Sequence, residues 1–295
     1  MEAIDQEMTK PSVVILGGSG NLGHSLRKLS PNLRDYEFLF PSRMNLPLQE
    51  VLQVVDYLDD LKPIAIVNAA AWTNVEGAET NQEEARKMNS TLPGILASWC
   101  SENGAYLIHF STDYVFDGSK VDPYLEDDQK SPLSFYGVSK SEGEDLILET
   151  NNLETTIVRT SGLYGFTTNN FVMKVLAKAI IADDLRVVND QEMTPTNSDD
   201  LAAFSLSLLG RAQVPKVVHF SNEGSTNWNE VARAIYRFVG QDPEKVKRIS
   251  SNEYETRAKR PRQSRLGTIY PDLTKENNQD WLDSLQRFLK EVTHE

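Results

Sequence analysis

The sequence predicts an α/β fold built on a doubly wound parallel sheet, with a smaller, discontinuous C-terminal lobe beside it. In the first half of the chain, short β-branched runs alternate with longer amphipathic stretches. The strand-like runs are apolar throughout, which is typical of parallel strands that are buried on both faces. After about residue 162, polar loops and helical patterns replace this alternation. We therefore divide the chain into a polar tail (1–11), a sheet domain that binds the cofactor (12–161) and a mainly substrate-binding lobe (162–295). The lobe segment is long enough to add one further strand to the sheet.

The individual elements follow from the spacing of apolar residues. Runs rich in Val, Ile, Phe and Tyr predict strands at 12–16, 36–40, 63–69, 105–111 and 155–161. Apolar residues three and four positions apart predict helices at 21–29, 48–61, 81–102, 134–150, 171–182, 198–211, 227–239 and 280–291.

Composition and charge exclude several classes of protein. The formal net charge is −13 and the isoelectric point is near 4.9, so the mean field repels nucleic acid and anionic membranes. The first ten residues, MEAIDQEMTK, carry three acids and lack the apolar run of a signal peptide. No run approaches the roughly 20 apolar residues that span a bilayer. The single cysteine, Cys100, cannot form an internal disulfide and is expected to be a buried side chain. We expect a cytoplasmic protein.

A glycine-rich loop, VILGGSGNLG, joins the first strand to the first helix. Glycines in this position let the backbone turn tightly and let a pyrophosphate approach the helix amino terminus. The spacing fits GxGxxG through Gly18, Gly20 and Gly23, and equally GxxGxxG through Gly17, Gly20 and Gly23. A glycine turn without a ligand is the alternative. The loop therefore predicts a Rossmann-like dinucleotide site.

The end of the second strand indicates which dinucleotide binds. An NAD site usually has an acid there, on the ribose 2′-hydroxyl, but the segment reads Phe-Pro-Ser-Arg43. A guanidinium and a hydroxyl suit a 2′-phosphate better. We expect NADPH, with NADH as the alternative.

The segment SFYGVSK places Tyr136 and Lys140 four residues apart on one helix face. A nearby cation would favour the phenolate and bring the pKa of the tyrosine toward neutrality, so that Tyr136 could act as a proton donor to a carbonyl. Thr112 follows an apolar strand, at the sheet edge where open parallel sheets bind ligands, and its hydroxyl could hydrogen-bond the same oxygen. A tyrosine followed four residues later by a lysine is a common coincidence, and the alternative interpretation of Ser-Thr-Asp is a strand end that starts a turn.

Several segments, in order, resemble the dTDP-4-dehydrorhamnose reductase family of extended short-chain dehydrogenases/reductases. These are VNAAAWTNVEGAE, STDYVFDG, SPLSFYGVSK, VRTSGLYG and RPRQSRL, which together with the glycine loop cover most of the chain. The resemblance favours the GxxGxxG spacing. It implies NADPH-dependent reduction of a 4-keto group on a nucleotide-linked 4-keto-6-deoxysugar, of the dTDP-4-dehydro-rhamnose type. It leaves open a homodimer.

Residue roles are carried over by position. The resemblance implies catalysis by Thr112, Tyr136 and Lys140, and sugar contacts from Thr112 and Asp113. It implies cofactor contacts from the residues of the loop, the strand ends and the helix, namely Gly17, Gly20, Asn21, Leu22, Gly23, Arg43, Ala71, Trp72, Thr73, Phe110, Tyr136 and Lys140. Arg260 and Arg265 match the basic positions that read the nucleotide diphosphate. Asn89 matches an asparagine that supports a proton-relay water, although its sequence context alone indicates a helix-surface residue.

The sequence departs from the family pattern at two substrate-facing places. The tryptophan that commonly follows Arg-Thr-Ser is replaced by Gly162, and a Tyr-Gly pair is replaced by Glu192-Met193. A missing aromatic wall would reshape the sugar pocket, so the sugar itself stays open. No residue spacing indicates a metal site.

Two other functions remain as alternatives. The first is another sugar-nucleotide enzyme: a dehydratase would place Asp-Glu where this chain has Asp113-Tyr114, and an epimerase would hold NAD, which Arg43 disfavours. The second is a non-catalytic, NADP-binding regulatory subunit, because STDYVFDG, GLYG and the basic run also resemble the β subunit of methionine adenosyltransferase.

Overall fold

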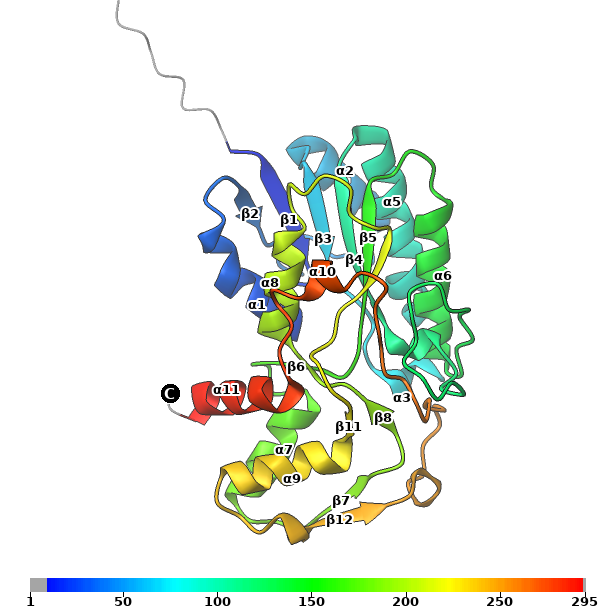
Figure 1. The fold of residues 1–295 in the computed structure, drawn as a ribbon. Helices are drawn as coiled ribbons and strands as arrows, with labels where there is room; N and C mark the ends of the chain where they lie inside the picture. Colours follow the sequence, from blue (N-terminus) through cyan, green and yellow to red (C-terminus); the bar gives the residue numbers. More distant parts are fainter. Residues whose placement is uncertain (1–9, 294–295) are drawn as a thin grey trace, which may run out of the picture.

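The computed structural model describes residues 10–293, so most of the polar tail expected at 1–11 lies outside the described residues. A six-stranded, fully parallel sheet of order β10-β5-β4-β3-β1-β2 forms the upper part of the molecule in Figure 1. Its strands are β1 (Ser12–Leu16), β2 (Glu37–Leu39), β3 (Ala65–Asn68), β4 (Tyr106–Thr112), β5 (Thr155–Thr160) and β10 (Val217–His219). The doubly wound α/β class predicted from the sequence is confirmed.

Helices cover both faces of this sheet. One face packs against α2 (Val51–Leu61), α5 (Leu92–Asn103) and α6 (Phe135–Glu149), and the other against α1 (Asn21–Leu29) and α8 (Ser198–Ser207). Adjacent residues of β1 explain why both faces are apolar, because Val13 belongs to one buried cluster and Val14 to the other. Short elements complete this part: α3 (Val75–Ala78), α4 (Gln82–Arg86), a π-helical segment (Lys87–Thr91) and a 3₁₀ turn (Asp113–Val115).

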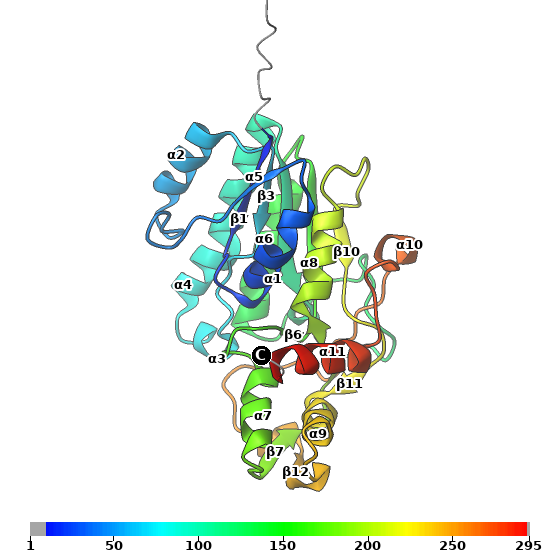
Figure 2. The ribbon, with the colours of Figure 1, turned by 90° about the vertical axis from the view of Figure 1, so that its left-hand side faces the viewer.

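The remaining elements build a smaller lobe below the carboxyl ends of the strands (Figures 1 and 2). It contains α7 (Phe171–Ile180), α9 (Trp228–Phe238) and α11 (Trp281–Thr293), whose apolar residues form a separate buried cluster. Short strand pairs line it, namely β7 (Leu185–Val188) with β12 (Val246–Ile249), β8 (Glu192–Met193) with β11 (Thr226–Asn227), and β6 (Leu163–Tyr164) with β9 (Thr196–Asn197). Helix α10 (Pro271–Thr274) and 3₁₀ turns at Ser30–Asn32, Pro243–Lys245 and Ser251–Glu253 lie in the connections.

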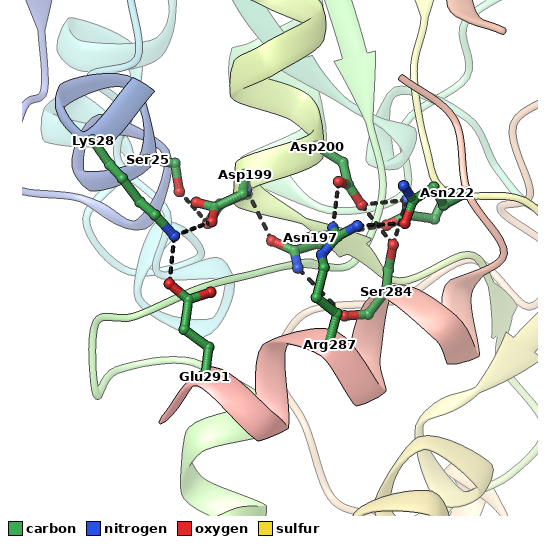
Figure 3. Close-up of polar contacts among 11 residues, drawn as sticks. Ser25, Lys28, Asn197, Asp199, Asp200, Asn222, Ser284, Arg287 and Glu291 are labelled. Atoms are coloured by element: carbon green, nitrogen blue, oxygen red, sulfur yellow. Dashed lines mark hydrogen bonds and ion pairs between the residues drawn. The ribbon is translucent and has the colours of Figure 1, made fainter. Parts of the chain in front are cut away.

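The chain crosses between the sheet and the smaller lobe more than once. Both α8 and β10 follow residue 162, yet they pack on the sheet, and β10 extends it beside β5. The last helix is tied to α1 and α8 by the polar contacts drawn in Figure 3. Lys28 of α1 lies 2.7 Å from Asp199 of α8 and 2.5 Å from Glu291 of α11. These contacts fix the lobe relative to the glycine loop, which precedes α1.

Candidate active site

A cleft of about 1660 Å³ lies between the carboxyl ends of the strands and the smaller lobe. Its walls include the glycine loop after β1, the ends of β3 and β4, the first turn of α6, and the basic segment 258–262. Open parallel sheets bind ligands at this edge because each strand leads there into a loop and a helix amino terminus. The cleft therefore contains most of the residues that the sequence nominated.

The geometry of the glycine loop matches the GxxGxxG assignment. Gly17 has φ +82°, and a Cβ atom there would lie 2.6 Å from the backbone of Ala69. A Cβ atom at Gly23 would lie 2.2 Å from the carbonyl oxygen of Gly17. At Gly20 the nearest atom would be 3.5 Å away, so this position has open space at the amino terminus of α1. Two glycines thus let the backbone pack closely, and the third leaves room for a diphosphate.

Asn21 and Leu22 both line the cleft, but the Asn21 side chain turns toward the smaller lobe. Its Oδ1 accepts hydrogen bonds from the backbone and the hydroxyl of Thr167, at 3.1 and 2.5 Å. The backbone of the first turn of α1 is left to face a ligand. Asn21 therefore also joins the cofactor loop to the loop before α7.

The part of the cleft beside the end of β2, where the sequence predicts the adenosine end of a dinucleotide, carries positive charge. Arg43 lines it and is exposed, as expected of a residue that reads a 2′-phosphate. Arg27 also lines it, with its guanidinium 4.1 Å from the centre of the Phe40 ring. The sequence did not indicate Arg27 as a site residue, because a basic residue in the last turn of a helix is usually exposed to solvent.

The segment after β3 places only part of the expected set in the cleft. Ala71 and Thr73 line it, whereas Trp72 does not. Instead, the Trp72 indole donates a hydrogen bond to the carbonyl oxygen of Asn74 at 2.9 Å. The Trp72 side chain therefore lies outside the lining of the cleft, and contact between Trp72 and the cofactor stays a prediction.

Asn89 explains why this segment is fixed. It is fully buried in the π-helical segment, so the helix-surface interpretation from its sequence context was wrong. Its Oδ1 accepts from the Trp72 backbone at 2.8 Å, and its Nδ2 donates to the Trp72 carbonyl and to Ser139 at 3.0 Å. A Cβ atom at Gly143 would lie 2.1 Å from the Asn89 carbonyl oxygen, so glycine allows α6 to approach. The sequence could not indicate these partners, which are distant along the chain.

Tyr136 lies in the first turn of α6, which begins at a serine cap. The Ser134 hydroxyl accepts from the Gly137 backbone at 3.3 Å, and the Tyr136 ring meets the edge of Tyr114 at 5.7 Å. Both Tyr136 and Thr112, the last residue of β4, line the cleft. The Thr112 hydroxyl accepts from the Tyr114 backbone at 3.2 Å, which fixes its rotamer. The structure therefore places two hydroxyl groups in the same wall.

The electrostatics of Tyr136 differ from the sequence expectation. Burial raises the pKa of the phenol, and a hydrogen bond with Thr112 opposes this only in part. The Lys140 Nζ donates to the Phe110 carbonyl oxygen at 2.6 Å and lies 3.2 Å from His109 Nε2. In this structure the Tyr136 pKa is raised, opposite to the shift toward neutrality that the sequence predicts, and the effect of Lys140 stays a prediction. Tyr136 is instead kept as a phenol by its surroundings.

Asp113 is buried beside these hydroxyl groups. Its Oδ1 accepts from Thr112 at 3.0 Å and its Oδ2 from Ser161 at 2.8 Å. Burial raises the pKa of the carboxyl, although hydrogen bonds from Ser264, Ser161 and Thr112 oppose the shift. The side chain lines the cleft, where a sugar hydroxyl would compete with these partners.

The two arginines nominated for the diphosphate lie in different surroundings. Arg260 lines the cleft, and its Nη2 is 2.6 Å from Glu76 Oε1. Arg265 does not line the cleft; it donates to the Val121 carbonyl oxygen, and its Nε lies 3.6 Å from Glu192. The arrangement therefore favours Arg260 over Arg265 for contact with a ligand.

Several lining residues were not nominated from the sequence. They are Lys174, Arg186 and Arg262, which are basic, and Phe171 and Trp228, whose rings lie 4.5 Å apart. Arg262 belongs to the basic run already quoted, but the others sit in ordinary helix and strand patterns. Only the fold brings them to the cleft.

Other kinds of site find little support between residues 10 and 293. That part of the chain contains no group of three or more His, Cys, Asp or Glu side chains placed to hold a metal ion. No helix within it has the length and apolar character needed to cross a membrane.

Comparisons with known proteins show which family the chain belongs to. The RmlD substrate binding domain family matches residues 11–294. A dTDP-4-dehydrorhamnose reductase of Streptomyces griseus is 36% identical over 263 residues, covering 87% of this chain and 86% of the relative. A dTDP-4-keto-6-deoxy-D-glucose reductase of Streptomyces niveus is 34% identical over 254 residues, covering 86% and 88%.

A solved structure is also similar to this chain over nearly its whole length. The dTDP-4-dehydrorhamnose reductase of Bacillus anthracis, crystallised in complex with NADP, superposes with a TM-score of 0.89 at 31% identity. The match covers 96% of this chain and 99% of that one. The glycine loop, the Tyr136 helix and the full-length matches lead to one conclusion: the chain belongs to the RmlD substrate binding domain family.

Proposed function

We propose that the protein uses NADPH to reduce the 4-keto group of a dTDP-linked 4-keto-6-deoxysugar. One observation carries this proposal: Tyr136 and Thr112 share a wall of the cleft that also contains the glycine loop. A hydroxyl pair at the strand ends can bind a carbonyl oxygen while a dinucleotide lies on the loop. Relatives over 30% identical are named as reductases of such sugars, which supports the substrate class.

The residues of this chain divide the work as follows. NADPH, when bound, would supply the hydride to C4. Thr112, whose hydroxyl donates to Asp113 Oδ1 in this structure, would turn that proton toward the carbonyl oxygen and polarise it, and Tyr136 transfers its phenolic proton to the same oxygen. Burial, which raises the Tyr136 pKa, keeps that proton in place until charge develops on the substrate. Asn89 holds the segment between β3 and α3, and Arg260 provides a cation for the diphosphate.

NADPH is supported over NADH by the charge at the adenosine end. Arg43 and Arg27 both line that part of the cleft, and a 2′-phosphate would pair with them. The complex of the Bacillus anthracis relative with NADP supports this choice.

The experiment follows NADPH oxidation at 340 nm with purified protein. dTDP-4-dehydro-rhamnose and dTDP-4-keto-6-deoxyglucose are compared as substrates, each with NADPH and NADH. The proposal expects turnover of at least one sugar and preference for NADPH. Binding of NADPH without turnover of either sugar would overturn it and favour the regulatory-subunit alternative. Conversion without net NADPH oxidation would indicate an epimerase or a dehydratase.

Location and partners follow from charge and composition. We infer a cytoplasmic protein with no nucleic-acid partner, because the net charge is −13 and the sole cysteine is buried as a free thiol. Self-association as a homodimer is the assembly to test, by light scattering at working concentration.

A further inference from the structure

The first turn of α6, which carries Tyr136, is held by a residue from another element. The backbone N–H of Phe135, the first residue of the helix, donates to Glu79 Oε1 at 2.8 Å. Glu79 directly follows α3, which lies near the lower end of α6 in Figure 1. The N–H groups of the first turn of a helix have no partner within the helix. The Glu79 carboxylate supplies one for the residue next to Tyr136.

The cap of α6 itself cannot replace this contact. Ser134 accepts from the Gly137 backbone through its hydroxyl at 3.3 Å, and from the Val138 backbone through its carbonyl oxygen at 2.9 Å. A capping serine bonds the second or third N–H group of a helix, so the first one is left over. The amino end of a helix also favours a negative charge. Glu79 therefore adds a long-range contact at the point where the local sequence offers none.

Glu79 is itself fixed, because α3 is anchored at both ends. Asn74 caps α3 by accepting from the Gly77 backbone at 2.9 Å, and the Trp72 indole donates to the Asn74 carbonyl oxygen at 2.9 Å. Beyond the helix, the Asn81 backbone donates to the Gly77 carbonyl oxygen at 2.9 Å. The carboxylate of Glu79 therefore extends from a backbone that has little freedom to move.

A second connection joins the same two parts of the chain. Ala71 and Thr73, in the segment between β3 and α3, line the cleft. Asn89, which holds the backbone of that segment, also donates to Ser139 Oγ at 3.0 Å, and Ser139 donates to the Tyr136 carbonyl oxygen at 2.9 Å. The segment after β3 and the turn of Tyr136 are thus linked at two points.

We propose that Glu79 is a positioning residue for Tyr136, because it fixes the first turn of α6 relative to the segment that lines the cofactor side of the cleft. The inference rests on the proposed function, in which hydride and proton must reach neighbouring atoms of one carbonyl group. Glu79 lies outside the cleft lining and acts through the Phe135 backbone. A misplacement of about 1 Å can cost about 100-fold in rate.

The rest of α6 has other attachments, so the loss of Glu79 should affect the first turn and not the whole helix. Arg86 of α4 forms two hydrogen bonds with Glu142 of α6, at 2.8 and 3.0 Å. Further along, Arg159 of β5 holds Glu144 at 2.7 and 2.9 Å. These pairs would keep α6 on the sheet in a protein that lacks the Glu79 carboxylate.

The first test is amide hydrogen exchange at Phe135, measured by NMR on the full-length protein. We expect exchange at this N–H to be at least about tenfold faster in Glu79→Ala, because its acceptor is lost. The control is Asp145→Ala, which removes an exposed carboxylate of the same helix that pairs with Lys130 at 2.7 Å. It should leave Phe135 unchanged. Equal exchange in wild type and Glu79→Ala would overturn the proposal, whether or not the protein turns over any sugar.

The second test is kinetic and uses NADPH with dTDP-4-dehydro-rhamnose. We expect Glu79→Ala to lower kcat by about 10- to 100-fold while the Kd for NADPH changes less than about threefold. Asp145→Ala should keep the wild-type kcat. A wild-type kcat in Glu79→Ala would overturn the proposal. Absence of turnover in the wild-type protein would instead contradict the proposed function, and the exchange measurement would then decide whether Glu79 fixes the turn.

Two conservative variants separate the contact from the charge, and they keep the test decisive if Glu79→Ala does not fold. Glu79→Gln keeps the length of the side chain and an acceptor oxygen, whereas Glu79→Asp keeps the charge on a side chain one methylene shorter. We expect Glu79→Gln to retain kcat within about threefold and Glu79→Asp to lose about as much as Glu79→Ala. The reverse order would overturn the proposal. Equal losses of kcat in both variants, in parallel with lower unfolding midpoints, would show a general structural role and also overturn it.

Discussion

The sulfur of Met193 lies 3.0 Å from the position that a Cβ atom would occupy at Gly162. These are two of the positions at which the sequence departs from the family pattern, and they are neighbours in the cleft. Gly162 also has φ +55°, where L-residues are strained. Met193 thus occupies space next to a position that cannot easily carry a side chain. The departures therefore lie next to one another in one part of the cleft.

A first prediction separates crowding from backbone strain at this position. Gly162→Ala should lower the free energy of unfolding by more than Gly104→Ala, because Gly104 has a similar φ of +64° but no atom within 4 Å of the added Cβ. Strain alone costs about 1–2 kcal/mol, and the excess at Gly162 reports the contact with its neighbours. Denaturant unfolding measures both values. If Met193→Ala fails to reduce the excess in the double variant, the sulfur is not the obstacle.

A second prediction concerns the cofactor phosphate. Arg43→Ala should raise the KM for NADPH by about 10- to 100-fold and leave the KM for NADH nearly unchanged, because a charge-assisted hydrogen bond contributes about 1.5–3 kcal/mol. Steady-state kinetics with both cofactors tests this. Arg34→Ala, on an exposed residue outside the cleft lining, is the control. Equal losses with NADPH and NADH would assign Arg43 to a general structural role.

A third prediction concerns the diphosphate of the sugar nucleotide. Arg260→Gln should raise the KM for the sugar nucleotide at least about tenfold, with little change in the Kd for NADPH. The matched control is Arg248→Gln, which removes an exposed arginine paired with Glu230 on β12 and α9. Substrate kinetics and NADPH titration by fluorescence distinguish the two effects. Weakened NADPH binding with an unchanged KM for the sugar nucleotide would contradict this prediction and assign Arg260 to the cofactor.

A fourth prediction follows from the buried thiol. Burial raises the pKa of Cys100 to about 12 from an ordinary value of 9.0. In native protein at pH 8, the thiol should be unreactive toward an aromatic disulfide reagent, and it should react at once in denaturant. Above pH 9 the unfolded chain releases this proton before the folded one does, so the free energy of unfolding should fall as pH rises toward 12. Rapid labelling of the native protein would refute the buried environment.

The sequence predicted the sheet and the glycine loop well because both depend on local patterns. The five strands predicted from apolar runs are all present in the sheet. The order of strand, glycine loop and helix indicated where the cleft lies. The sixth strand, β10, is only three residues long, and its pairing with β5 is set by the whole fold. Local patterns carry no such information.

The site was harder to predict where long-range contacts decide it. The burial of Asn89 depends on Trp72 and Ser139, which lie 17 and 50 residues away. The Tyr136–Lys140 spacing correctly indicated a shared helix, but the partners of Lys140, His109 and the Phe110 carbonyl oxygen, are on β4, so its surroundings could not be judged from the spacing. The place of Trp72 outside the cleft has the same origin.

The most direct test of the proposed mechanism compares the wild-type protein with Tyr136→Phe. The substitution removes one hydroxyl and keeps the ring that packs against Tyr114. NADPH oxidation is followed at 340 nm with dTDP-4-dehydro-rhamnose, and NADPH binding is followed by fluorescence. We expect kcat to fall by about 10²- to 10⁴-fold while the Kd for NADPH changes less than about threefold. Turnover by the variant at the wild-type rate would contradict the account, because Tyr136 would then not be the proton donor.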